Sequence, residues 1–233
     1  SSSSPPLTAA DFAPLIDLYN ARRYAELENR VQGLLVKHPN APFAWQLLGG
    51  ARQMQGKDAL AAFQKVASLS PQDAGAQFNL GVAFKSAGQL EQAAKCYRQA
   101  LALNPRYLEA LNNLGGVLQD LGQLDEAVQC YRQVLAIQPR SASTLNNLGI
   151  ALKDIGRPDE AVQCYRQAIQ LKPDYADAHY NLGNVFKEQK QFDQAVACYR
   201  QAVQFRPDFE EALTNLSSAL RTLGDTETAL LYA

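Results

Sequence analysis

The sequence lacks the features that mark membrane proteins, secreted proteins and nucleic-acid binders. No run approaches the roughly 18 consecutive apolar residues of a transmembrane helix. Residues 1–6 carry no basic segment of the kind that begins a secretory signal. The 22 lysines and arginines balance 23 aspartates and glutamates, so the basic excess of a nucleic-acid binder is missing. We therefore expect no nucleic acid and no membrane among the partners.

Groups that carry catalysis are scarce as well. The two histidines, His38 and His179, stand far apart, and the sequence contains no zinc-protease, nucleophile-elbow or P-loop pattern. Hydrophobic residues make up 47% of the chain, which is enough for a sizeable core and argues against disorder. We predict that this segment is not an enzyme and that it needs no cofactor and no metal.

What the sequence does contain is repetition. The tetrapeptide Cys-Tyr-Arg-Gln begins at residues 96, 130, 164 and 198, and Asn-Leu-Gly begins at residues 79, 113, 147 and 181. The spacing is 34 residues in both series. A proline closes each unit: Pro39, Pro71, Pro105, Pro139, Pro173 and Pro207. A fixed period of this length predicts a stack of equivalent units, not a single globular core.

Each unit has the pattern of two helices joined by a tight turn. Over residues 108–121 apolar residues recur at helical spacing, and Gly122 interrupts the pattern. A second apolar stripe follows in the same unit. Gly115 and Ala127 are small enough to let the two helices approach closely, and Tyr131 can fill the space beside them. The sequence therefore predicts a helical hairpin for each period.

This pattern resembles the tetratricopeptide repeat (TPR), whose signature is W-x2-L-G-x2-Y, then A-x3-F, then P. Trp45, Leu48 and Gly49 match its first half. Pairs of alanine and an aromatic residue match its second half: Ala59 and Phe63, Ala93 and Tyr97, Ala127 and Tyr131, Ala161 and Tyr165, Ala195 and Tyr199. The resemblance covers residues 11–233. It implies an all-α, right-handed superhelical solenoid of about 6.5 helix-turn-helix TPR hairpins.

The repeats differ in regularity along the chain. We expect a linker or arm over 1–10, a degenerate repeat over 11–39, a repeat with a shortened turn over 40–71, four regular repeats over 72–207, and a partial, truncated repeat over 208–233. The shortened turn is expected because Ala59 follows Gly56 two residues too early. Arg52 stands where leucine or an aromatic residue is usual, and Lys190 replaces a turn glycine.

Four cysteines share one repeat position: Cys96, Cys130, Cys164 and Cys198. Equivalent positions in stacked hairpins lie roughly 16–20 Å apart, at the usual distance between helix axes. That separation is too large for a disulfide or a shared zinc ion. We interpret the cysteines as small apolar helix residues, whose reduced state fits a cytoplasmic location.

Asparagine recurs at another position, on the first helix of each hairpin: Asn79, Asn113, Asn147, Asn181 and Asn215. The first helices of TPR proteins line the inner, concave surface, so the resemblance implies a ladder of amides along a groove. An amide both donates and accepts hydrogen bonds, which suits the backbone of an extended polypeptide. The alternative is that these asparagines serve helix packing.

Charged residues follow the asparagines on the same helices. Lys153 and Lys187 share one repeat position, and Asp120 and Asp154 share the next. We predict that these four residues bind peptide together with the asparagines. The alternative is that they form a solvated surface.

The asparagine ladder resembles the TPR domain of O-GlcNAc transferases, in which such asparagines hold the substrate backbone, and residues 180–188 read like one of its repeats. The leading function is a protein–protein interaction scaffold that binds an extended protein or peptide in the concave groove. The alternative is the substrate-recruiting TPR domain of a larger glycosyltransferase whose catalytic part is absent. A chaperone-type carboxylate clamp matches poorly, because its lysine position holds Phe78, Asn112, Asn146 and Tyr180.

The last hairpin stops at Ala233, midway through its expected second helix and without a polar capping helix. A terminal repeat without a cap exposes an apolar face. We therefore expect the chain to be a piece of a longer protein, and we consider self-association through the uncapped C-terminal repeat.

Overall fold

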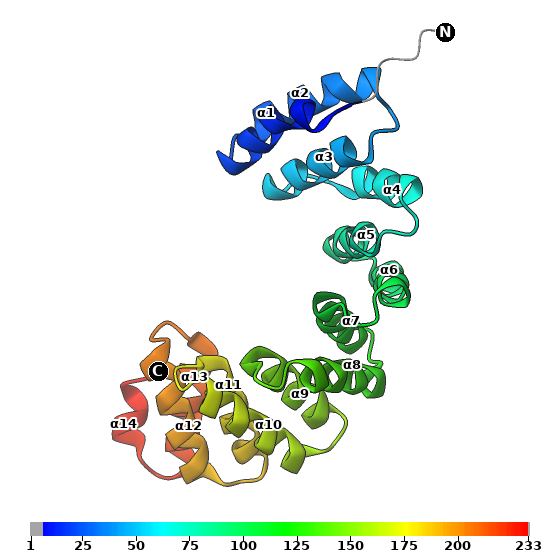
Figure 1. Ribbon diagram of the computed structural model, residues 1–233. Helices are drawn as coiled ribbons and strands as arrows, with labels where there is room; N and C mark the ends of the chain where they lie inside the picture. Colours follow the sequence, from blue (N-terminus) through cyan, green and yellow to red (C-terminus); the bar gives the residue numbers. More distant parts are fainter. Residues whose placement is uncertain (1–6, 233) are drawn as a thin grey trace. The chain divides into compact units, whose positions relative to one another are not determined.

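The structure, a computed structural model, describes residues 7–232, and every regular element in that range is a helix (Figure 1). The described range holds 14 helices: α1 (Ala9–Asn20), α2 (Tyr24–Lys37), α3 (Pro42–Met54), α4 (Leu60–Leu69), α5 (Ala74–Ser86), α6 (Leu90–Leu103), α7 (Leu108–Asp120), α8 (Leu124–Ile137), α9 (Ala142–Asp154), α10 (Pro158–Leu171), α11 (Ala176–Glu188), α12 (Phe192–Phe205), α13 (Glu210–Thr222) and α14 (Thr226–Leu230). The predicted all-α solenoid of helical hairpins is confirmed. None of these helices is long and apolar enough to cross a membrane.

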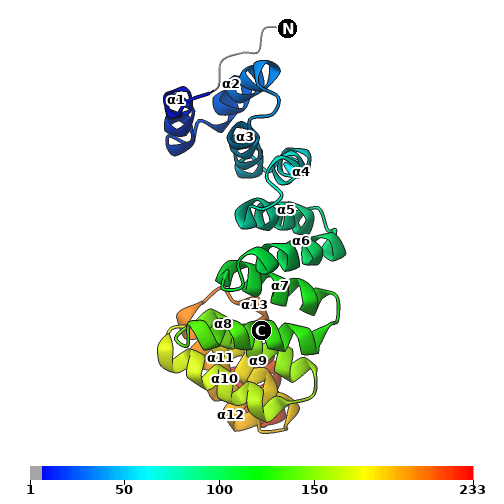
Figure 2. The same ribbon diagram turned by 45° about the vertical axis from the view of Figure 1, so that its right-hand side comes forward.

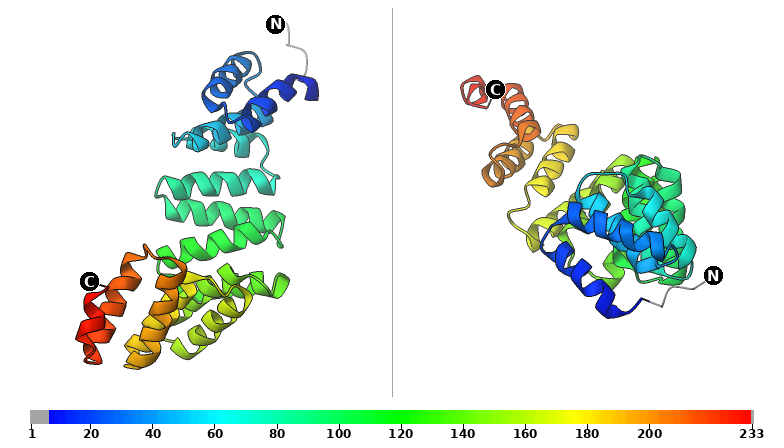
Figure 3. Two further views of the ribbon diagram at one scale, coloured as in Figure 1. Left: turned by 90° about the vertical axis from the view of Figure 1, so that its left-hand side faces the viewer. Right: turned by 90° about the horizontal axis from the view of Figure 1, so that it is seen from above.

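The chain divides into two compact units, Ser1–Val117 and Leu118–Ala233, and the boundary falls inside α7. In the N-terminal unit the consecutive helices α1 to α6 pack against one another (Figure 2). In the C-terminal unit the same holds for α8 to α14, and the short α14 lies beside α13 (Figure 3). Each unit is thus a stack in which a helix contacts its neighbours in sequence.

A residue in the left-handed conformation lies in the turn of each of the seven hairpins in residues 7–232. Glycine takes this place in five turns, with φ between 67° and 86°: Gly56, Gly88, Gly122, Gly156 and Gly224. Arg22 and Lys190 take it in two others, with φ of 57° and 59°. A side chain in this conformation costs roughly 1–2 kcal/mol, so these two turns are strained relative to the glycine turns.

The core of a hairpin is an aromatic ring packed against a glycine. A Cβ atom added to Gly81 would lie 2.7 Å from Cε1 of Tyr97, and one added to Gly149 would lie 2.5 Å from Cε1 of Tyr165. Both rings are at most 1% exposed. The predicted pairing of a small residue with a large one is confirmed in these hairpins, because the ring occupies the volume that a larger residue at the glycine would need.

The second hairpin corrects the expected shortened turn. Five residues, 55–59, connect α3 to α4, whereas three residues, 87–89, connect α5 to α6. The helix is short instead, because α4 has 10 residues and α6 has 14. The deletion has removed the first turn of the second helix. Phe63 still packs on Gly49, where an added Cβ would lie 2.8 Å from the ring, so the rest of α4 cannot shift along its axis.

Arg52 occupies an apolar position because it neutralises a buried carboxylate. Glu28, on α2, is 7% exposed and accepts hydrogen bonds from Arg52 Nε (2.9 Å), Gln55 Nε2 (3.1 Å) and Lys57 Nζ (2.7 Å). The bonds from Lys57 and Arg52 lower the pKa of Glu28 to about 2. This group of four residues, which we call the Glu28 cluster, joins the first two hairpins.

Candidate peptide-binding site

The five predicted asparagines all lie on first helices, and all are half-buried. They occupy α5 (Asn79), α7 (Asn113), α9 (Asn147), α11 (Asn181) and α13 (Asn215). Each stands directly before a leucine that is at most 8% exposed: Leu80, Leu114, Leu148, Leu182 and Leu216. Leucine burial thus fixes the direction of each asparagine, which lies at the border between the core and the solvent.

Asn181 bridges two hairpins of the C-terminal unit. Its Nδ2 donates to Oδ1 of Asn146, on α9, at 3.0 Å. Asn146 is only 4% exposed, so this bond satisfies an acceptor that would be costly to leave without a partner. Asn147, the neighbouring residue, makes no side-chain hydrogen bond within the C-terminal unit. Packing therefore occupies part of the Asn181 amide and leaves the Asn147 amide available.

Asn215 is held more completely. Its Nδ2 donates to Oδ1 of Asn184 at 3.1 Å and lies 3.3 Å from the hydroxyl of Tyr180, both on α11. Its Oδ1 accepts a hydrogen bond from Nζ of Lys187 at 2.9 Å. An amide can make about four hydrogen bonds, so little capacity is left for a ligand at this position.

Of the four predicted charges, Lys153 makes the ion pairs. Nζ of Lys153 lies 3.7 Å from a carboxylate oxygen of Asp154 and 3.7 Å from one of Glu188, on the next first helix. Asp120 is exposed at the end of α7. Pairs this long and this open to solvent contribute about 0–1 kcal/mol to stability. A charged group of a ligand can therefore replace either partner of these ion pairs at little cost in free energy.

These contacts connect three successive first helices into one polar surface. We call it the first-helix row, and it comprises Asn147, Asn181, Asn215, Lys153, Asp154, Lys187 and Glu188 on α9, α11 and α13. The row offers amides to a peptide backbone and charges of both signs to its side chains. It contains no group arranged as a nucleophile with a base.

The aromatic residues beside these positions were missed by the sequence reasoning. The ring of Tyr180 lies 4.8 Å from that of Phe209, and the ring of Phe78 lies 4.9 Å from that of Tyr107. The two pairs occupy the same repeat positions. Phe78 is 102 residues, or three repeats, before Tyr180, and Tyr107 is 102 residues before Phe209. That spacing was the available signal.

In the N-terminal unit Asn79 lines a hollow of about 220 Å³. Tyr19, Phe43, Gln46 and Gln53 are among its other walls. Gly50 also faces it, and a Cβ added there would lie 3.3 Å from the ring of Tyr19. The hollow offers aromatic surface together with neutral amides, which suits an uncharged ligand group.

His179 has a structural place. Its Nε2 lies 2.9 Å from the carbonyl oxygen of Pro173. Trp45, at the same repeat position, donates from Nε1 to the carbonyl oxygen of Pro39 at 2.8 Å. This position therefore anchors a first helix to the proline loop that precedes it, and the ring is used for packing.

The four cysteines are free thiols. Cys96 and Cys130 are buried, whereas Cys164 and Cys198 are half-buried, and burial raises the pKa of each of the latter two to about 11. Among residues 7–232 no group of three or more His, Cys, Asp or Glu side chains is placed to hold a metal ion. A thiol with a raised pKa stays protonated at neutral pH and is a poor nucleophile.

A stack of helical hairpins with a polar row on its first helices defines a helical-repeat scaffold of the kind that binds other proteins. Tetratricopeptide-repeat models match residues 83–122, 106–174 and 176–209. Together these matches cover more than half of the chain, and the chain belongs to the tetratricopeptide repeat family. Domains of this family are typically modules for protein interaction.

Solved structures share this fold. MamA is 27% identical with a TM-score of 0.61, and the match covers 66% of this chain and 90% of that one. PilF from Pseudomonas aeruginosa is 22% identical with a TM-score of 0.71, covering 82% and 88%. YrrB, a TPR protein with an unusual peptide-binding site, is 20% identical with a TM-score of 0.65, covering 78% and 95%. No curated protein matches the sequence.

Proposed function

We propose that the chain is a scaffold that binds an extended polypeptide across its first helices. The observation that carries this proposal is the first-helix row, in which a half-buried asparagine recurs on α9, α11 and α13 beside the charges of Lys153, Asp154, Lys187 and Glu188. A peptide backbone presents a donor and an acceptor at every residue, and amides can pair with both. Binding of this kind tolerates many ligand sequences.

The spacing of the hairpins sets the length of the ligand. Successive first helices lie roughly 16–20 Å apart if each hairpin is two helix diameters wide. An extended chain advances about 3.3 Å per residue, so a ligand passes one hairpin in about five or six residues. A segment of roughly 10–12 residues would then reach from α9 to α13 by the same estimate.

The residues of the row have different shares in this function. Asn147 supplies the amide with the most free capacity, and Asn181 keeps its oxygen and one N–H. Lys153, Lys187, Asp120 and Asp154 accept ligand side chains of either charge. In the N-terminal unit Asn79 and Asn113 take the corresponding part. Asn215 positions other residues of the row and does not bind the ligand itself, because its amide is hydrogen-bonded to Lys187 and Asn184.

An array of random 15-residue peptides tests the function. We expect the chain to bind a subset of them, and Asn147→Ala to weaken that binding by about threefold to tenfold, the worth of one or two backbone hydrogen bonds. The matched control is Gln167→Ala, which removes an exposed amide from the second helix α10 and should change nothing. Binding that is unchanged in Asn147→Ala would contradict the role of the amides, and an array without any bound peptide would contradict the function.

Three further expectations stay predictions. They are the substrate-recruiting role in a larger glycosyltransferase, self-association through the C-terminal repeat, and a cytoplasmic location. Residues 7–232 carry no observation that favours any of them over the scaffold function.

A further inference from the structure

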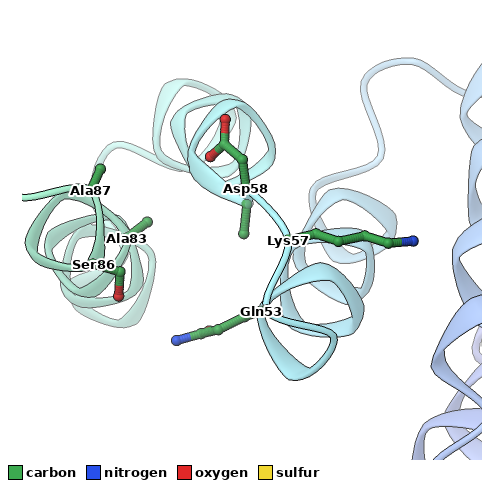
Figure 4. Close-up of a pocket in the computed structure, with 8 residues that line it drawn as sticks. Gln53, Lys57, Asp58, Ala83, Ser86 and Ala87 are labelled. Atoms are coloured by element: carbon green, nitrogen blue, oxygen red, sulfur yellow. The ribbon is translucent and has the colours of Figure 1, made fainter.

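A recess of about 340 Å³ opens between the second and third hairpins of the N-terminal unit, beside the start of α4 (Figure 4). Its lining includes Gln53, Gly56, Ala59, Ala83, Ser86 and Ala87. Most of these side chains are small, so the recess is a place where side chains of ordinary size are missing.

The first cause of the recess is the lost turn of α4. In the four following hairpins, the residue two positions after the left-handed turn residue is apolar and half-buried: Leu90, Leu124, Pro158 and Phe192. In the second hairpin the corresponding residue after Gly56 is Asp58, which is exposed. Its Oδ1 accepts a hydrogen bond from the backbone N–H of Leu60 at 2.8 Å, so it caps the shortened helix. No apolar side chain therefore closes this turn.

The second cause is a small residue at the end of α5. Ala87 follows the last residue of that helix. Its equivalents in the later hairpins are all larger: Leu121, Ile155, Gln189 and Leu223. The third hairpin thus offers only a methyl group where the later hairpins offer a longer side chain, and both missing side chains leave space in the same recess.

The charged residues in the lining point elsewhere. Lys57 is directed away from α5, and its Nζ lies 2.7 Å from Oε2 of Glu28 (Figure 4). Asp58 accepts a hydrogen bond from the backbone N–H of Leu60 at the start of α4. The Gln53 side chain extends from α3 toward α5 (Figure 4). Apart from Lys57 and Asp58, the lining offers a ligand methyl groups, the Gln53 amide and the Ser86 hydroxyl.

The C-terminal unit is charged at the equivalent positions. Lys153 and Lys187 correspond to Gln53, and Asp154 and Glu188 correspond to Ser86. The two residues that line the recess, Gln53 and Ser86, are therefore neutral, whereas the equivalent pair Lys153 and Glu188 carries both signs. Lys85, the third-hairpin residue at the Gln53 position, is not among the residues that line the recess. A neutral surface favours a neutral ligand, because a charge brought against it would lose its hydration without gaining a partner.

We propose that this recess binds an aliphatic side chain of about leucine size from an extended, uncharged segment of a peptide. The ligand's side chain supplies the apolar group that the shortened turn lacks, while Gln53 and Ser86 pair with its backbone. Gln53 also lines the hollow beside Asn79, so the ligand continues from the recess toward a predicted asparagine. The inference rests on the proposed function and assigns one subsite to it.

The test uses three labelled nonapeptides of alanine, serine and asparagine with a central leucine, lysine or glutamate. Fluorescence polarisation with the full chain should give at least tenfold tighter binding for the leucine peptide. Ala87→Leu restores the side chain of the other hairpins and should weaken that binding at least tenfold. The control, Gln189→Leu, places leucine at the equivalent position of the C-terminal unit and should change the affinity less than twofold.

A second variant covers the case in which Ala87→Leu lowers the melting temperature. It replaces residues 56–59 by the six-residue sequence of 122–127, which rebuilds the lost turn with its leucine, and it should also weaken binding at least tenfold. Equal affinity for the three peptides, or full binding by either recess variant, would overturn this subsite. Binding in the random array would then still support the scaffold function, whereas no binding in either experiment would overturn both.

Discussion

Neighbouring hairpins are joined by different chemistry in the two units. In the C-terminal unit, exposed amides and charges on successive first helices contact each other, as Asn181 does with Asn146 and Lys153 with Glu188. In the N-terminal unit, the first two hairpins share the buried Glu28 cluster, and the next contact is interrupted by a recess. The hairpin core is the same in both, since Phe63 and Tyr165 each pack on a glycine. The comparison indicates that the core determines the fold and leaves the surfaces between hairpins free to differ.

The largest effect should come from the shared core. Tyr165→Ala and Phe63→Ala should each cost about 3–5 kcal/mol, because a buried ring is lost and a cavity remains. The chain has one tryptophan, Trp45, which reports on the N-terminal unit alone. In a urea titration, the midpoint of the Trp45 fluorescence transition should therefore fall in Phe63→Ala. In Tyr165→Ala the circular dichroism transition should fall to lower urea, whereas the Trp45 fluorescence midpoint should stay unchanged. Equal fluorescence shifts in both variants would mean that the units unfold together, against the nearest-neighbour behaviour of repeats.

A smaller effect, confined to the N-terminal unit, should come from Glu28. Its pKa is about 2 in the folded chain against an ordinary value of 4.5, so its stabilising contribution is present above about pH 4.5 and is lost as pH falls toward 2. At pH 7, Glu28→Gln should cost about 1.5–3 kcal/mol, the worth of its charged hydrogen bonds. Trp45 fluorescence during acid titration measures this. The wild type should lose stability in that window more steeply than Glu28→Gln, and parallel curves would argue against the cluster.

The smallest effect should come from the two strained turns, one in each unit. Lys190→Gly and Arg22→Gly should each stabilise the chain by about 1 kcal/mol, because glycine removes the cost of a side chain at positive φ but adds backbone entropy to the unfolded state. Thermal melts provide the measurement, and Gly156→Ala serves as the reverse control with a lowered melting temperature. A turn variant without any gain would show that its side chain makes compensating contacts.

The repeated features were predictable because each depends on contacts that recur every 34 residues. The turn glycines, the ring packed on Gly149 and the prolines after each hairpin belong to this group. Whether the two-residue deletion would shorten the turn or the helix was not predictable from the sequence. The outcome depends on the position of Gly56 in the turn and on the packing of Phe63 on Gly49, which together leave the start of α4 as the segment that is shortened. The partner of Arg52 was hidden for a different reason. Glu28 lies 24 residues away and occurs in a hairpin whose repeat pattern is weak.

The asparagines illustrate a further limit. Their spacing identified the position, but spacing cannot distinguish an amide that faces a ligand from one that faces the next hairpin. The distinction depends on the neighbour in space. Asn215 meets Lys187 and Asn184 and is occupied, whereas Asn147 meets no such partner within its unit.

The Glu28 cluster has a consequence for how the stack assembles. Hairpins that share so much sequence present similar faces, and a folding chain could stack them out of order, a known failure of repeat proteins. Arg52 is replaced at the equivalent positions by apolar residues: Phe84, Leu118, Leu152, Phe186 and Leu220. A first hairpin stacked on any of these would bury the carboxylate of Glu28 without a cation, at a cost of several kcal/mol. One buried charge therefore determines which hairpin can stack on α2, in a series whose other hairpins have similar faces.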